Sequence, residues 1–171
     1  MQTAALLLGG NQGRVPELFN HVIDFLESAG VQVTDKSALY LTEPWGMEAE
    51  NLFYNQALLV RTDADPVALL DLLLSIEARL GRKRGTTHYE SRPIDIDILL
   101  FDKLLVSRSD LIIPHPRMHL RRFALTPLSE IAPDWMHPLL GKTIRQLFDE
   151  CQDTLKVQKT KNHNMTGKRI D

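Results

Sequence analysis

The sequence contains a single cysteine, Cys151, and therefore cannot build a disulfide framework. It contains no run of the roughly 18 apolar residues that a membrane-spanning helix needs. Its N-terminal segment lacks the basic and long apolar regions of a secretory signal. We therefore expect a reduced, cytoplasmic protein with no membrane partner.

The sequence also lacks an excess of charge of either sign, because 20 Lys and Arg residues stand against 22 Asp and Glu residues. This balance excludes a uniformly basic nucleic-acid coat, and we expect no nucleic-acid partner. With 171 residues, 43% of them hydrophobic, the chain can bury its own core without a structural metal. We expect one domain over residues 1–151 and a polar, mobile tail over residues 152–171.

Strand and helix patterns alternate along the chain. Short apolar or β-branched runs predict strands over residues 3–8, 31–41, 53–61 and 94–101. Apolar residues at helical spacing predict helices between Pro16 and Gly30 and between Asp65 and Gly81. This order is typical of a ferredoxin-like β-α-β-β-α-β unit, an α+β fold with both helices on one face of an antiparallel sheet. A C-terminal hairpin after Asp102-Lys103 and a helix near residues 143–150 should extend it.

Asp95 and Asp97 are the most informative pair of polar residues. Because they are two apart on a predicted strand, their carboxylates share a face, about 7 Å apart, and could hold hard cations. An isolated Asp-x-Asp is about as often the solvated face of an edge strand. Here a basic stretch from Arg82 to Arg92 ends three residues before Asp95. A polyphosphate with Mg²⁺ needs carboxylates to bind the cations and basic side chains to bind the phosphates. The combination therefore favours a phosphate-transfer site.

Other patterns leave alternatives open. Phe53 and Asn55 share a strand face and would fit a flat heterocycle, but they would equally fit a core Phe beside a strand-end Asn. His115 lies in a second basic segment, where a phosphate contact and a surface position are about equally expected. Gly9-Gly10-Asn11 lacks the spacing of a dinucleotide-binding motif and predicts a turn, and Gly141-Lys142-Thr143 lacks the first Gly of a P-loop.

Several separated motifs, taken together, resemble the 6-hydroxymethyl-7,8-dihydropterin pyrophosphokinase family over residues 3–148. They are Thr42-Glu-Pro-Trp-Gly, Phe53-Tyr-Asn, Glu77, Gly81-Arg-Lys-Arg, Ser91-Arg-Pro-Ile-Asp-Ile-Asp-Ile-Leu-Leu, and the stretch that begins Pro114-His-Pro-Arg-Met-His-Leu-Arg-Arg-Phe. The resemblance implies transfer of the pyrophosphoryl group of ATP to the hydroxymethyl group of the pterin. The products would be AMP and the pterin diphosphate, in folate biosynthesis.

The resemblance also implies roles for individual residues. Two Mg²⁺ ions would be bound by Asp95 and Asp97, which would act in catalysis together with Arg82 and Arg92. The nucleotide would contact Glu77, Arg84, Ile98, His115 and Arg121. The pterin would stack between Phe53 and Phe123, and the full set of residues around it would be Thr42, Pro44, Trp45, Gly46, Phe53, Asn55 and Phe123. We expect the protein to act as a monomer on these two small molecules.

Three residues depart from the family pattern. Gly10 replaces the usual Ser after the first strand, Tyr89 replaces a frequent Trp, and Leu74 stands where some members have a polar residue near the nucleotide. Two other classes remain open on the residues alone. A metal-dependent nuclease or glycosyl transferase could use Asp-x-Asp but would not need the pterin set. A ferredoxin-like RNA-binding module would use the basic loop, but its aromatic RNP1 pattern is absent.

Overall fold

The structure is a computed structural model, and it describes residues 1–42, 53–81 and 93–160. A six-stranded antiparallel sheet has the order β5-β1-β4-β3-β8, and β2 also pairs with β4. Its strands are β1 (Gln2–Gly10), β2 (Gln32–Lys36), β3 (Tyr40–Thr42), β4 (Phe53–Thr62), β5 (Asp95–Phe101) and β8 (Val157–Lys159). The predicted C-terminal hairpin is present as β6 (Val106–Ser107) and β7 (Ile112–Ile113).

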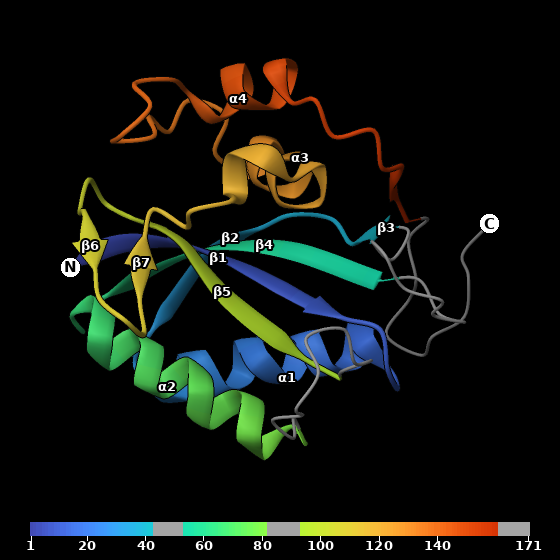
Figure 1. Ribbon diagram of the computed structural model, residues 1–171. Helices are drawn as coiled ribbons and strands as arrows, with labels where there is room; N and C mark the ends of the chain where they lie inside the picture. Colours follow the sequence, from blue (N-terminus) through green and yellow to red (C-terminus); the bar gives the residue numbers. More distant parts are fainter. Residues whose placement is uncertain (43–52, 82–92, 161–171) are drawn as a thin grey trace.

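The α-helices of the described residues cover the two faces of the sheet (Figure 1). They are α1 (Val15–Ser28), α2 (Pro66–Arg79), α3 (Arg122–Ile131) and α4 (Ile144–Glu150). Helices α1 and α2 lie on one face, and α3 and α4 lie on the other (Figure 1). The predicted α+β class and the placement of the first two helices on one face are confirmed. No helix of the described residues is long and apolar enough to cross a membrane.

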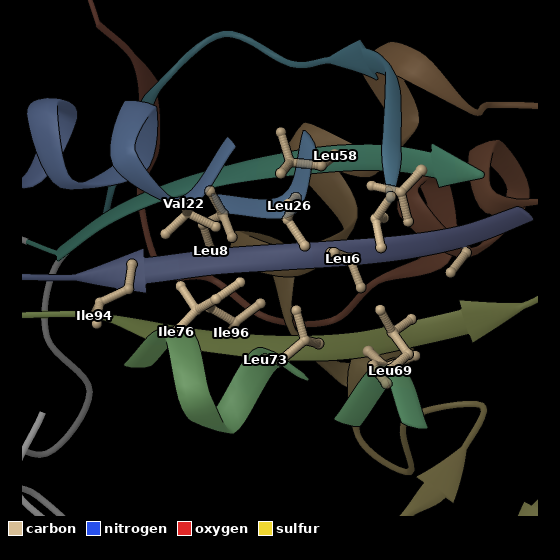
Figure 2. Packing of buried hydrophobic residues seen from close by; sticks show 14 of the residues in the cluster. Leu6, Leu8, Val22, Leu26, Leu58, Leu69, Leu73, Ile76, Ile94 and Ile96 are labelled. Carbon is tan, nitrogen blue, oxygen red and sulfur yellow. The ribbon is translucent and has the colours of Figure 1, made fainter. Parts of the chain in front are cut away.

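The central strand β1 is buried on both faces, which explains its continuous apolar run. Leu6 and Leu8 belong to the core beneath α1 and α2, whereas Ala5 and Leu7 belong to the core beneath α3 and α4. Figure 2 shows Val22 and Leu26 of α1 and Leu69, Leu73 and Ile76 of α2 gathered around Leu6, Leu8 and Leu58 of the sheet. Successive strand residues therefore point alternately into two cores, and this alternation determines on which face of the sheet each polar side chain lies.

The helix boundaries follow the expected local signals. The Asp65 carboxylate accepts a hydrogen bond of 2.8 Å from the Ala68 backbone N–H, which caps the start of α2. Gly30 and Gly81 follow the ends of α1 and α2 with φ values of +83° and +90°, which glycine adopts at little cost. α3 was not predicted as a helix, because Pro127 lies inside it and interrupts the sequence pattern of a helix.

Two strand predictions were wrong in detail. The expected single strand over residues 31–41 is divided at Ser37, whose Oγ accepts a hydrogen bond from the Ala57 N–H at 2.9 Å. The Ser37 carbonyl also accepts a hydrogen bond of 2.8 Å from Gln56 Nε2. The chain thus bends between β2 and β3 while both strands pair with β4. Gly9 and Gly10 do not form the predicted turn, because they continue β1 to its end.

Strand β8 lies within the segment that we predicted as a tail. It pairs with β3 in antiparallel register, with Tyr40 opposite Lys159 and Thr42 opposite Val157. No strand was predicted here, because the segment is polar and has no alternating pattern. Residues 161–171 lie outside the described part of the chain, and the division of the chain at residue 151 stays a prediction.

Candidate active site

Asp95 and Asp97 lie on the face of β5 that looks toward α3. Their neighbours Ile96 and Ile98 pack into the core beneath α1 and α2, whereas Leu99 packs beneath α3 and α4. Because side chains alternate along a strand, the two aspartates share the face of Leu99. Both are half-buried. The predicted juxtaposition of the two carboxylates is therefore present at the N-terminal end of β5.

Phe53 and Asn55 of β4 lie on the same face of the sheet, because the alternation continues to Ala57 and Leu59 beneath α3. Gly9 of β1 pairs with Asn55 on one side and with Asp95 on the other. These three residues form a row across three strands, which places Asn55 and Asp95 about 10 Å apart. The row links the predicted pterin residues to the predicted metal ligands.

Gly9 keeps the middle of this row free of a side chain. A Cβ atom at Gly9 would lie 3.0 Å from Asn55 Nδ2, closer than nearly all real Cβ contacts. The same Nδ2 donates a hydrogen bond of 3.1 Å to the Leu8 carbonyl, which fixes the buried Asn55 amide. Sequence reasoning missed this role of Gly9, since a Gly pair at the end of a strand also fits a turn.

Thr42 and Phe53 are direct partners across β3 and β4 and therefore share a face. The Thr42 side chain is 3% exposed, and its Oγ1 has no hydrogen-bond partner among the described residues. A buried hydroxyl in this situation suits a ligand that can supply the missing partner.

Phe123 lies in the first turn of α3, in the helical layer that covers this face of the sheet. It packs against the core beneath α3 and α4, and the guanidinium carbon of Arg121 lies 5.5 Å from the centre of its ring. Phe53 and Phe123 thus come from the sheet and from a helix that covers it. This arrangement fits the two aromatic walls predicted for the pterin.

His115 is held against β5, because its backbone N–H donates a hydrogen bond of 2.9 Å to the Leu99 carbonyl. Burial lowers the pKa of His115, the positive charges of Arg121 and Arg117 lower it as well, and Asp95 acts in the opposite direction, so that the pKa falls from 6.5 to about 4. The imidazole is therefore neutral at neutral pH. Its Nδ1 accepts a hydrogen bond of 3.2 Å from the Arg117 N–H, so Nε2 carries the proton and can donate to a phosphate oxygen.

Glu77 of α2 is buried and binds the backbone between the two aspartates. Its Oε1 accepts a hydrogen bond of 2.8 Å from the Ile96 N–H. β5 is the edge strand on this side of the sheet, so among the described residues its outer N–H groups have no neighbouring strand to accept their hydrogen bonds. The Glu77 carboxylate accepts the one from Ile96. Ile98, by contrast, turns its side chain into the core beneath α1 and α2, away from the face of Asp97. Only its backbone is left for a nucleotide contact.

Six predicted site residues lie outside the described part of the chain. They are Pro44, Trp45 and Gly46, between β3 and β4 in the sequence, and Arg82, Arg84 and Arg92, between α2 and β5. Gly10, one of the departures from the family pattern, is described and makes a close approach. A Cβ atom there would lie 2.2 Å from the Pro93 carbonyl oxygen, so the end of β1 passes directly over the residue that leads into β5.

Comparison with known proteins identifies the family of the chain. The family model of 7,8-dihydro-6-hydroxymethylpterin-pyrophosphokinase (HPPK) matches residues 5–133. The 2-amino-4-hydroxy-6-hydroxymethyldihydropteridine pyrophosphokinase of Methylorubrum extorquens is 39% identical over 147 residues, covering 85% of this chain and 91% of the relative. The enzyme of the same name from Bacillus subtilis is 40% identical over 129 residues, covering 75% of this chain and 77% of the relative.

Solved structures show the same fold at lower identity. The crystal structure of Plasmodium falciparum HPPK-DHPS with pteroate has a TM-score of 0.71 and 18% identity, and it covers 87% of this chain. The chain spans only 44% of that longer protein. The family match and the similar relatives show that the chain belongs to the HPPK family. It is a pyrophosphokinase of folate biosynthesis, which transfers the pyrophosphoryl group of ATP to 6-hydroxymethyl-7,8-dihydropterin.

Proposed function

We propose that Asp95 and Asp97 hold two Mg²⁺ ions together with the triphosphate of ATP. Mg²⁺ in enzymes that act on phosphates is commonly bound by one or two carboxylates plus substrate oxygens, with water completing the shell. The described residues contain no group of three or more His, Cys, Asp and Glu side chains that could hold a metal ion. A half-buried pair of carboxylates therefore fits ions that arrive with the nucleotide better than a closed structural metal site.

When bound, the ions would neutralise phosphate oxygens and stabilise the charge that moves to the leaving group. The residues of the chain have positioning roles. Asp95 and Asp97 fix the triphosphate at the start of β5, while His115 Nε2–H and Arg121 lie nearby to bind further phosphate oxygens. The loop residues Arg82, Arg84 and Arg92 complete this proposal from the family resemblance, as basic groups that neutralise the polyphosphate.

The pterin is placed at the other end of the Asn55–Gly9–Asp95 row. Its ring stacks between Phe53 and Phe123, and the Asn55 amide and the Thr42 hydroxyl bind its polar edge. Pro44, Trp45 and Gly46 follow Thr42 in the sequence and complete the pterin site in this proposal. A hydroxymethyl group on the side of the ring near Gly9 then faces the phosphates at Asp95.

The reaction follows from this order of groups. The hydroxymethyl oxygen attacks the β-phosphorus, a new P–O bond forms, and the bond from that phosphorus to the α,β-bridging oxygen breaks. The hydroxyl proton leaves to solvent, and AMP carries away the bridging oxygen. Attack at the γ-phosphorus would release ADP instead, so the nucleotide product reports which phosphorus is attacked.

Product analysis tests the proposed geometry. With Mg²⁺, ATP and 6-hydroxymethyl-7,8-dihydropterin, chromatography should show AMP and pterin diphosphate rising in equal amounts. A Phe123→Ala variant should lose affinity for the pterin by about tenfold or more. Accumulation of ADP, or AMP formed equally well without the pterin, would contradict the proposed placement of the two substrates. We further propose that the enzyme works as a cytoplasmic monomer.

A further inference from the structure

The segment of residues 151–160, which we name the C-terminal brace, connects two elements that border the proposed pterin site. In Figure 1 this red segment leaves α4, passes α3 and ends beside β3. Helix α3 carries Phe123, and β3 carries Thr42 and pairs with the strand of Phe53. The brace therefore contacts both sides of the proposed site without supplying a ligand to it.

The first half of the brace fixes the start of α3. Arg122, the residue before Phe123, donates through its backbone N–H to Asp153 Oδ2 at 3.0 Å. Its guanidinium donates to the Asp153 carbonyl through Nε and to the Cys151 carbonyl through Nη2, both at 2.9 Å. Asp153 thus supplies the acceptor that the first turn of α3 needs, because Arg121 at the N-cap position makes no side-chain cap.

The second half of the brace fixes β3. β8 pairs with β3, and the Thr160 N–H donates to the Leu39 carbonyl at 2.8 Å. Glu130 of α3 connects this pair of strands to the helix. Its carboxylate lies 3.3 Å from Lys159 Nζ on β8. It also accepts hydrogen bonds from the Tyr40 hydroxyl at 2.8 Å and from the Ala38 N–H at 2.7 Å. Glu130 joins the far end of α3 to β3 and β8 at once.

The charge states of Tyr40 and Glu130 favour the contacts between α3, β3 and β8. Burial, followed by the hydrogen bond and charge of Glu130, raises the pKa of Tyr40 to about 12, so the hydroxyl stays protonated and donates. Burial alone would raise the pKa of Glu130, but the Ala38 N–H, Tyr40 and Lys159 outweigh it and hold the pKa below its usual value. The carboxylate therefore remains ionised at neutral pH and keeps all three donors.

We infer that the C-terminal brace is a positioning element of the pterin site: by holding α3 at Arg122 and β3 through β8 and Glu130, it sets the spacing between Phe123 and the Phe53–Thr42 pair. The inference rests on the proposed placement of the pterin between Phe53 and Phe123. Among the proposed nucleotide residues, Asp95, Asp97 and His115 are held by β5, whereas Arg121 adjoins the brace contact at Arg122. Because the metal-binding pair and His115 do not depend on the brace, its loss should weaken pterin binding more than nucleotide binding.

Truncation after Gln152 tests this inference. Removal of residues 153–171 should raise the Kd of the pterin, measured by its fluorescence with the α,β-methylene analogue of ATP present, by about tenfold or more. The Kd of the analogue with Mg²⁺ should change by less than about threefold, since β5 is untouched. Truncation after Thr160 is the matched control: it removes residues 161–171, leaves the brace intact and should leave both constants unchanged.

A milder variant covers the case in which the truncated chain does not fold. Lys159→Met keeps the side-chain stem and β8 but removes the charge that binds Glu130, and it should raise the pterin Kd selectively by a smaller factor. A folded truncated protein with an unchanged pterin Kd, or with equal losses for both ligands, would overturn the inference. Normal pterin affinity in Phe123→Ala would instead overturn the placement of the pterin, so the two failures are distinguishable.

Discussion

At the scale of single residues, Asp95 and Asp97 are the side chains on which the proposed chemistry depends most. Asp97→Asn removes one metal-binding charge while keeping the size of the side chain, so we expect kcat to fall by about 10²-fold or more with little change in the thermal unfolding temperature. Steady-state kinetics and a melting curve measure the two effects. Asp110→Asn, an exposed change on the small hairpin, is the control. Near-normal turnover in a folded Asp97→Asn protein would contradict the assignment.

His137 provides a residue-scale prediction about pH and stability. The side chain is 3% exposed, and its Nδ1 accepts hydrogen bonds of 3.2 Å from the Leu139 and Leu140 N–H groups. Burial, and then the charge of His119, lowers its pKa below the usual 6.5. Below pH 6.5 the unfolded chain therefore binds this proton more readily than the folded protein does, and the free energy of unfolding must decrease as the pH falls.

His137→Asn keeps a side-chain acceptor for the two backbone donors and removes the titrating group. Urea unfolding of both proteins at about pH 7.5 and about pH 5.5 measures the loss of stability on acidification. We expect a smaller loss in His137→Asn than in the unsubstituted protein. Equal losses in the two proteins would show that His137 does not contribute to the acid sensitivity.

At the scale of secondary-structure elements, β1 closely approaches the start of β5 at Gly10. Gly10 leaves no room for a side chain, because its Cβ would meet the Pro93 carbonyl oxygen at 2.2 Å and the carbonyl carbon at 3.1 Å. Gly10→Ala must therefore push the chain at Pro93 outward. We expect a loss of about 1–3 kcal/mol in the free energy of unfolding, and a lower kcat because Asp95 lies two residues beyond Pro93.

Gly141→Ala is the matched control for this substitution. Its Cβ would meet no atom within 4 Å, but its φ of +64° disfavours alanine, so it isolates a backbone cost of about 1 kcal/mol. Urea unfolding compares the two proteins. If Gly10→Ala is no more costly than Gly141→Ala and retains full turnover, the close contact between β1 and Pro93 does not constrain the site.

Elements with strong local patterns could be predicted from the sequence, and elements defined by long-range partners could not. α2 has an apolar stripe, the Asp65 cap and the Gly81 stop, all of which are local signals. β8 has a polar sequence and exists because β3 offers an unpaired edge far away in the chain. The break at Ser37 likewise depends on hydrogen bonds to β4, which no pattern within residues 31–41 could indicate.

At the scale of the whole molecule, the two faces of the sheet have different tasks. The face beneath α1 and α2 is a continuous apolar core, as Figure 2 shows, and it supports β5 from below. The opposite face carries Phe53, Asn55, Asp95 and Asp97, which lie outside the apolar cluster that the described residues form beneath α3 and α4. A rigid core on one side thus positions the polar groups on the other.

The site could be predicted only in part for the same reason. Spacing alone placed Asp95 beside Asp97 and Phe53 beside Asn55, because each pair lies on one strand. The relation between the pairs depends on the pairing of Gly9 with both strands, which only the sheet register reveals. His115 was a candidate phosphate contact from its basic segment, with a surface position equally expected, whereas Arg121 and Phe123 entered by family resemblance.

Counting the bound metal ions is the most direct test of the claim that Asp95 and Asp97 hold two of them. Mn²⁺ can replace Mg²⁺ at oxygen ligands, and the α,β-methylene analogue of ATP cannot be cleaved at the bond that the reaction breaks. Equilibrium dialysis monitored by Mn²⁺ paramagnetic resonance, with the analogue and the pterin present, should give two ions per chain. The Asp95→Asn/Asp97→Asn double variant should bind fewer. One ion or none in the unsubstituted protein, or two ions in the double variant, would contradict the account.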